Sequence, residues 1–218
     1  MVSNSIIIYQ EIKAVLIKVL GYHCVMCNNY DFRVLQFDHK KGSGRKEARS
    51  FKSGFNMAKY YYKNLDIAKD RLQLLCANCN WIKRSENKEH IYAKIRTTQH
   101  DIDVRFKHKI RADLFKIVGA KCILCNNDDI RVLIFRRKNG SFNQELNIFG
   151  SATVVNSYYR KNPDRARSNL YTICWNCSYI QEYKKRMERE KMKYHIYKSL
   201  THLVNICREQ ELKESVSF

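Results

Sequence analysis

The sequence predicts an α+β protein made of two similar domains in tandem. The first observation is that four cysteines, arranged as two Cys-x-x-Cys pairs, recur after a shift of 98 positions. The second is that each repeat combines apolar residues at helical spacing with short apolar stretches typical of strands. A period of 98 is too long for a solenoid, so we expect two domains, at residues 1–98 and 99–218. The cysteines are Cys24, Cys27, Cys76 and Cys79, repeated as Cys122, Cys125, Cys174 and Cys177.

Each repeat is expected to open with a helix that ends at a glycine, Gly21 in the first repeat and Gly119 in the second. A strand then follows at residues 32–37 and 130–135, and turn residues come after it. The second cysteine pair follows a short apolar stretch and precedes a further helix. The expected helices cover residues 81–95 and 179–203, and the join near residues 96–105 contains no Pro or Gly, which favours a helical or closely packed connection.

The net charge is +20, from 41 Lys and Arg against 21 Asp and Glu. Both repeats contribute about equally, because residues 1–98 carry 18 basic and 8 acidic side chains. Such an excess predicts a nucleic-acid partner, with a merely solvated surface as the alternative. No apolar run approaches the roughly 18 residues of a membrane span, and the first 20 residues lack the features of a signal peptide. We therefore expect an intracellular protein with no membrane partner and with reduced cysteines.

The cysteine spacing is typical of zinc sites. Four thiolates in two Cys-x-x-Cys pairs suit tetrahedral Zn²⁺, so we expect two structural zinc ions per chain. Residues 28–75, between the two pairs, far exceed the about 15–20 residues of a simple zinc ribbon. This insert is expected to contain a hairpin and one or two short helices. A site closed by four sulfurs has no open coordination position, so the zinc would be structural and not catalytic.

Three polar residues of the first repeat stand at fixed positions relative to its cysteines. Asp38 and His39 follow the predicted strand, and Asn80 directly follows the last cysteine. Asp and Asn oxygens suit Mg²⁺, which stabilises charge on a phosphate, and an imidazole can accept a proton near neutral pH. Taken singly, the Asp-His pair could lie on a surface turn and Asn80 could cap a helix.

The first repeat resembles the HNH (ββα-metal) endonucleases, in particular the zinc-stapled phage and homing type typified by recombination endonuclease VII. The resemblance rests on the first cysteine pair, on the FDH sequence at residues 37–39 and on LLCANCNWIK at residues 74–83, and it covers roughly residues 22–90. It implies a ββα-metal domain in which His39 is the general base. Asp38 and Asn80 would bind one catalytic Mg²⁺ or Mn²⁺, although most members of this type have His where this chain has Asn80.

The second repeat keeps the cysteine spacing of the first and lacks these three polar residues. Arg136 and Arg137 replace Asp38 and His39, and Ser178 replaces Asn80. Guanidinium groups neither bind Mg²⁺ nor act as bases near neutral pH, but they suit phosphate contacts. We therefore expect an inactive, degenerate HNH-like domain that binds nucleic acid. Further phosphate contacts are expected from Lys83, Lys184 and Lys185, with ordinary helix-surface lysines as the alternative.

The predicted function is a metal-dependent endonuclease that hydrolyses phosphodiester bonds of double-stranded DNA. One active site per chain predicts a nicking or homing enzyme, and a homodimer could cut both strands or resolve a junction. The alternative is a catalytically inactive protein, derived from the same fold, that binds nucleic acid or has a structural role in a ribonucleoprotein.

Overall fold

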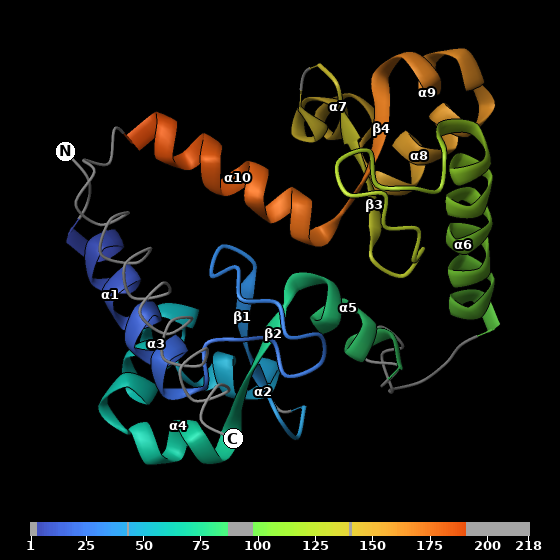
Figure 1. Cartoon of the computed structure of the whole chain (residues 1–218). Helices are drawn as coiled ribbons and strands as arrows, with labels where there is room; N and C mark the ends of the chain where they lie inside the picture. The colour runs from blue at the N-terminus through green and yellow to red at the C-terminus, as the bar shows by residue number, and fades with distance from the viewer. Residues whose placement is uncertain (1–3, 43, 87–97, 140, 191–218) are drawn as a thin grey trace, which may run out of the picture. The chain divides into compact units, whose positions relative to one another are not determined.

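A computed structural model describes residues 4–42, 44–86, 98–139 and 141–190 (Figure 1). It contains helices and two small antiparallel sheets of two strands each, which confirms the predicted α+β class. The chain divides into two compact units. The first comprises residues 1–80 and 179–218, and the second comprises residues 81–178. Within the described ranges, no helix is long and apolar enough to cross a membrane.

The first unit is built around the hairpin of β1 (Leu35–His39) and β2 (Leu72–Cys76). The strands are antiparallel, with Leu35 opposite Cys76 and His39 opposite Leu72. Helix α1 packs against α3 and α4. The paired strands β1 and β2, with α5 directly after β2, form a strand–strand–helix motif, and α2, α3 and α4 stand between the two strands in the chain. The helices of this part of the chain are α1 (Asn4–Val19), α2 (Gly44–Ser50), α3 (Gly54–Lys63), α4 (Leu65–Arg71) and α5 (Ala77–Glu86).

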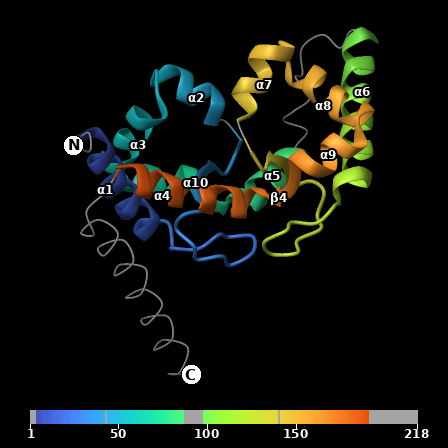
Figure 2. The ribbon, with the colours of Figure 1, turned by 90° about the horizontal axis from the view of Figure 1, so that it is seen from above.

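The second unit repeats this order 98 residues later. Strands β3 (Leu133–Arg137) and β4 (Leu170–Cys174) pair with Leu133 opposite Cys174 and Arg137 opposite Leu170, the same register as in the first hairpin. Figure 2 shows α6 alongside α8 and α9, which pack against it. The helices are α6 (Thr98–Val118), α7 (Phe142–Phe149), α8 (Ala152–Lys161), α9 (Pro163–Asn169) and α10 (Trp175–Glu190).

Several predicted boundaries shift in the structure. Both predicted strands begin and end later, at residues 35–39 and 133–137, because turns precede them. The helices expected at 81–95 and 179–203 begin earlier, since the last cysteine of each repeat, Cys79 or Cys177, already lies in their first turn. Their predicted ends fall within residues 87–97 and 191–218, outside the described residues. Of the join at 96–105, residues 98–105 belong to α6.

The unit boundaries fall inside α5 and α10, which differs from the tandem division predicted at residue 98. The boundaries fall there because each of these helices packs apolar side chains into the core of the other repeat's unit. In the first unit, Tyr183 of α10 packs edge-on against Phe32, with 5.6 Å between ring centroids. In the second unit, Trp81 of α5 stacks on Trp175 with 4.7 Å between centroids and 3° between ring planes. Each core therefore includes part of the helix that follows the other repeat's second cysteine pair.

Candidate metal centres and polar site

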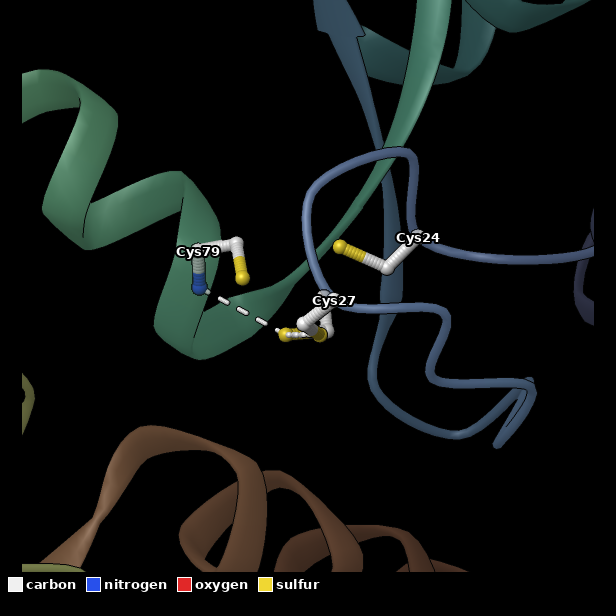
Figure 3. Close-up of side chains that lie close together, drawn as sticks. Cys24, Cys27 and Cys79 are labelled. Atoms are coloured by element: carbon white, nitrogen blue, oxygen red, sulfur yellow. Dashed lines mark hydrogen bonds between the residues drawn. The ribbon is translucent and has the colours of Figure 1, made fainter.

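The first four-cysteine set converges to one point. Its ligand atoms all lie within 4.8 Å of one another, and Sγ of Cys27 is 3.7 Å from Sγ of Cys76. Figure 3 shows the sulfurs of Cys24, Cys27 and Cys79 turned toward one another. Zinc–sulfur bonds of about 2.3 Å in a tetrahedron place the sulfurs about 3.8 Å apart, whereas a disulfide bond is about 2.05 Å long. The spacing therefore fits a tetrahedral zinc ion and not a disulfide.

The second set has the same geometry. The ligand atoms of Cys122, Cys125, Cys174 and Cys177 also lie within 4.8 Å of one another. Sγ of Cys125 is 3.7 Å from Sγ of Cys174. The prediction of two four-cysteine sets is thus confirmed, and each set could hold a structural zinc ion.

Local backbone geometry arranges both sets. An asparagine follows each first cysteine pair in the left-handed region, Asn28 with φ of 54° and Asn126 with φ of 59°. Asparagine tolerates this conformation better than most residues. Its amide donates to the carbonyl of the first cysteine, at 2.8 Å in the first repeat and 2.9 Å in the second, which closes the turn. At the second pair, the amide of Cys79 donates to Sγ of Cys76 at 3.5 Å, and Cys177 does the same to Cys174 at 3.5 Å.

The thiols of the first set have divergent acidities. The hydrogen bond from Cys76 lowers the pKa of Cys24 to about 4, while burial raises the pKa of Cys79 to about 12. The ionised Cys24 also contributes to the raised pKa of Cys79, because sulfurs this close repel one another when ionised. All four become thiolates only when a cation neutralises them, which is what zinc supplies when it is bound.

Asp38 and Asn80 belong to one polar face of the first hairpin. Oδ2 of Asp38 accepts a hydrogen bond from Nε2 of Gln73 at 2.8 Å. Nδ2 of Asn80, in the first turn of α5, donates to Oε1 of Gln36 at 2.7 Å. Gln36 and Asp38 are two residues apart on β1, and Gln73 stands opposite Asp38, so these side chains emerge on the same face. The fold therefore brings two of the three predicted site residues to one surface.

The side chain of His39 lies on the opposite face of the strand pair. It is the last residue of β1, and its side chain is only 7% exposed. Its Nε2 contacts the carboxylate of Glu47 in α2 and lies 3.2 Å from the hydroxyl of Tyr61 in α3. Among the described residues, the groups of three or more metal-ligating side chains are the two cysteine sets, so His39 and Asp38 form no such group. The structure thus does not gather all three predicted residues at one point.

The environment of His39 is a buried polar network. The hydroxyl of Tyr61 donates to Oε2 of Glu47 at 2.7 Å. Burial alone would raise the pKa of Glu47, but hydrogen bonds from Tyr61 and His39 outweigh it and lower that pKa below its usual value. Burial and the same carboxylate raise the pKa of Tyr61. Glu47 is therefore an anion that accepts from two donors.

The second unit holds arginines at the equivalent positions. Arg136 donates from Nε to Oγ of Ser178 at 3.1 Å, so the residues at the positions of Asp38 and Asn80 are in direct contact here. Arg137 is only 9% exposed, and its Nε donates to Oε2 of Glu145 at 2.6 Å. Its guanidinium carbon also lies 4.4 Å from the ring centroid of Phe142. Arg137 is therefore part of an internal ion pair with Glu145, and the phosphate contact expected from sequence stays a prediction.

The three predicted lysines lie on the helices that follow the second cysteine pairs. Lys83 is partly buried on α5, whereas Lys184 and Lys185 are exposed on α10. Sequence reasoning did not identify Glu47, although a signal for it exists. Glu145 and Tyr159 repeat Glu47 and Tyr61 at the 98-residue offset, and the hydroxyl of Tyr159 likewise donates to Glu145.

No family model, curated protein or solved structure is similar enough to this chain to count as a match.

Proposed function

We propose that this chain is a metal-dependent, HNH-type endonuclease that nicks double-stranded DNA, with one active site in the first unit. The observation that carries the proposal is the common face of Asp38 and Asn80, directly beside a four-cysteine set in a strand–strand–helix motif. The contact between Arg136 and Ser178 supports it, because it joins the two equivalent positions of the second repeat.

The donor atoms on this face fit a hard divalent cation. Asp38 has two carboxylate oxygens, of which Oδ2 accepts from Gln73. Asn80 uses its amide nitrogen for Gln36, and its carbonyl oxygen is the atom that a cation would take. Mg²⁺ and Mn²⁺ prefer such oxygen ligands, and two protein ligands leave coordination positions for water and phosphate. When bound, the ion supplies charge stabilisation for the phosphate and for the leaving oxygen.

The remaining roles follow from the charge and from the resemblance. His39 is the proposed base that takes a proton from the attacking water. The net charge of +20 attracts the DNA backbone, and the exposed Lys184 and Lys185 of α10 are proposed to contact phosphates. In the second unit, Arg136 is proposed to do the same. Both cysteine sets are proposed to bind structural zinc.

One observation favours the second candidate function, a catalytically inactive protein that binds nucleic acid. His39 is buried, and its Nε2 is committed to Glu47. A protein of this kind would bind DNA with the same salt dependence and would cut nothing.

A plasmid-nicking assay separates the two functions. The wild-type protein, loaded with zinc, is expected to nick supercoiled plasmid only after Mg²⁺ or Mn²⁺ is added. Asn80→Ala removes a proposed ligand and should lower the nicking rate by about 100-fold, the usual cost of losing one electrostatic stabiliser. Ser178→Ala alters the equivalent position of the second repeat and should leave the rate unchanged. Equal nicking by Asn80→Ala and wild type would refute the proposed site. DNA binding without nicking by the wild type would favour the inactive protein.

A further inference from the structure

Two glutamines of the first hairpin bond directly to the proposed metal ligands. Nε2 of Gln73 donates to Oδ2 of Asp38 at 2.8 Å. Nδ2 of Asn80 donates to Oε1 of Gln36 at 2.7 Å. Both distances lie at the short end of the usual range for such bonds, and all four side chains are partly buried. Each bond therefore restricts the rotation of one proposed ligand.

The two glutamines act through opposite ends of their amide groups. An ionised carboxylate can only accept, so the amide nitrogen of Gln73 faces Asp38. Gln36 instead offers its oxygen to the amide nitrogen of Asn80. Because the nitrogen and the oxygen of an amide point in different directions from one carbon atom, this bond turns the carbonyl oxygen of Asn80 away from Gln36. That oxygen is the atom that a hard cation takes.

The bond between Gln36 and Asn80 also joins two elements. Gln36 lies on β1, two residues before Asp38, and Asn80 lies in the first turn of α5, 44 positions further along the chain. In the second repeat, the corresponding tie between strand and helix is made by Arg136 and Ser178 themselves. The first repeat thus makes this tie with a separate side chain, and the proposed ligand positions are not needed for it.

The second repeat lacks the glutamines as well as the ligands. Ile134 stands at the position of Gln36 and Tyr171 at that of Gln73, while the strand register is unchanged. Neither replacement carries an amide. The hairpin therefore forms without these glutamines, and they occur only in the repeat that has the ligands. This is the distribution expected of side chains that serve the ligands and not the shared fold.

We propose that Gln36 and Gln73 are positioning residues that orient the oxygens of Asn80 and Asp38 toward one divalent cation. This inference rests on the proposed function. Hydrogen-bonding partners behind metal ligands typically change metal affinity or activity by about 10-fold to 100-fold. Ligands that are already held by such partners need little further ordering when the ion binds.

Manganese binding measures this role without any cleavage. Mn²⁺ alone is titrated into the zinc-loaded full-length protein, and electron paramagnetic resonance follows the free ion. Gln36→Leu and Gln73→Leu are each expected to raise the Kd for Mn²⁺ by about 10-fold or more. Gln36→Glu keeps an acceptor for Asn80 and should bind Mn²⁺ at least as tightly as the wild type. Ile134→Leu places the same residue at the equivalent position of the second repeat and should leave the Kd unchanged.

A ligand variant separates the positioning role from the ligand role. Asn80→Ala removes a proposed ligand and defines the loss of affinity when the site fails. Wild-type affinity in Gln36→Leu and Gln73→Leu, together with a loss in Asn80→Ala, would refute the positioning role and leave the ligands intact. Weaker binding by Gln36→Glu would contradict the acceptor role of Gln36. A wild type that binds no Mn²⁺, or an Asn80→Ala variant that binds it normally, would overturn the site and this inference with it.

Nicking kinetics then connect the glutamines to the reaction. Below the wild-type Kd for Mn²⁺, nicking by Gln36→Leu should be about 10-fold slower than by the wild type. At saturating Mn²⁺ most of the rate should return, because mass action overcomes weaker binding. A deficit that persists at saturation would indicate a structural defect and contradict the positioning role, and thermal melting checks folding. Mn²⁺ binding without nicking by the wild type would instead refute the nuclease function and leave the positioning role standing.

Discussion

In the first unit a partly buried glutamate contacts a histidine, and in the second the equivalent glutamate contacts an arginine. Around this exchange the two units keep the same hairpin register, the same four-cysteine geometry and the same tyrosine next to the glutamate. The polar residues that differ lie on strands β1 and β3 and in the first turn of α5 and α10. The comparison teaches that the cysteine sets and the apolar core maintain the fold. The polar residues that could take part in a reaction can therefore change without loss of structure.

The largest expected effect comes from breaking one cysteine set. Cys76→Ser removes a ligand of the first set, and because metal binding is coupled to folding, zinc content should fall from about two ions per chain to about one. Cys174→Ser should do the same in the second unit. Elemental analysis measures the zinc, and circular dichroism follows the loss of structure. Cys207→Ser, outside both sets, is the control, and a zinc loss in that variant would contradict the assignment of ligands.

A second test concerns the core of the second unit. Trp81→Ala removes the ring that stacks on Trp175 and should lower the free energy of unfolding by about 3 kcal/mol. The equivalent position after the second repeat is Tyr179, which is 39% exposed, so Tyr179→Ala should cost less than about 1 kcal/mol. Urea unfolding measures both. Equal costs would mean that α5 does not complete the core of this unit.

The third test concerns Gly44, which the second repeat replaces with Phe142 at the 98-residue offset. Gly44→Ala places a methyl group against Nδ1 of His39 and should slow DNA nicking by at least about tenfold, since small misplacements near a reacting group are costly. Gly54→Ala is the matched control at the start of α3, because a Cβ there meets nothing within 4 Å. Comparable nicking rates for the two variants would show that the packing of Gly44 against His39 does not affect cleavage.

The smallest expected effect is a pH dependence of stability. The folded-state pKa of Glu47 is lower than its ordinary value of 4.5, so its contribution is present above that pH and is lost as the pH falls through the folded value. The wild type should therefore be more stable than Glu47→Gln at pH 7, and the difference should shrink below about pH 4.5. Urea titrations of both proteins at each pH measure it. A difference that does not change with pH would mean that Glu47 is not ionised in the folded protein.

The sequence predicted some of the site and missed other parts for identifiable reasons. The cysteine sets were predictable because each Cys-x-x-Cys pair is recognised from neighbouring residues, and because the same spacing occurs in both repeats. The shared face of Asp38 and Asn80 was predicted by the resemblance, although the glutamines that bond to them were not noticed. The burial of His39 was not predicted, because its partners Glu47 and Tyr61 are 8 and 22 residues further along the chain.

By itself, the sequence determined the α+β class, the two metal-ligand sets and the loss of the acidic and imidazole groups from the second repeat, since all of these depend on residue type and spacing. Only the tertiary structure decided two further features. The alternation of side chains along β1 sends Asp38 and His39 to opposite faces. Helices α5 and α10 are each divided between the two units. The reason is that burial of apolar side chains is favourable, and Trp81 and Tyr183 pack against the core of the unit that the other repeat forms.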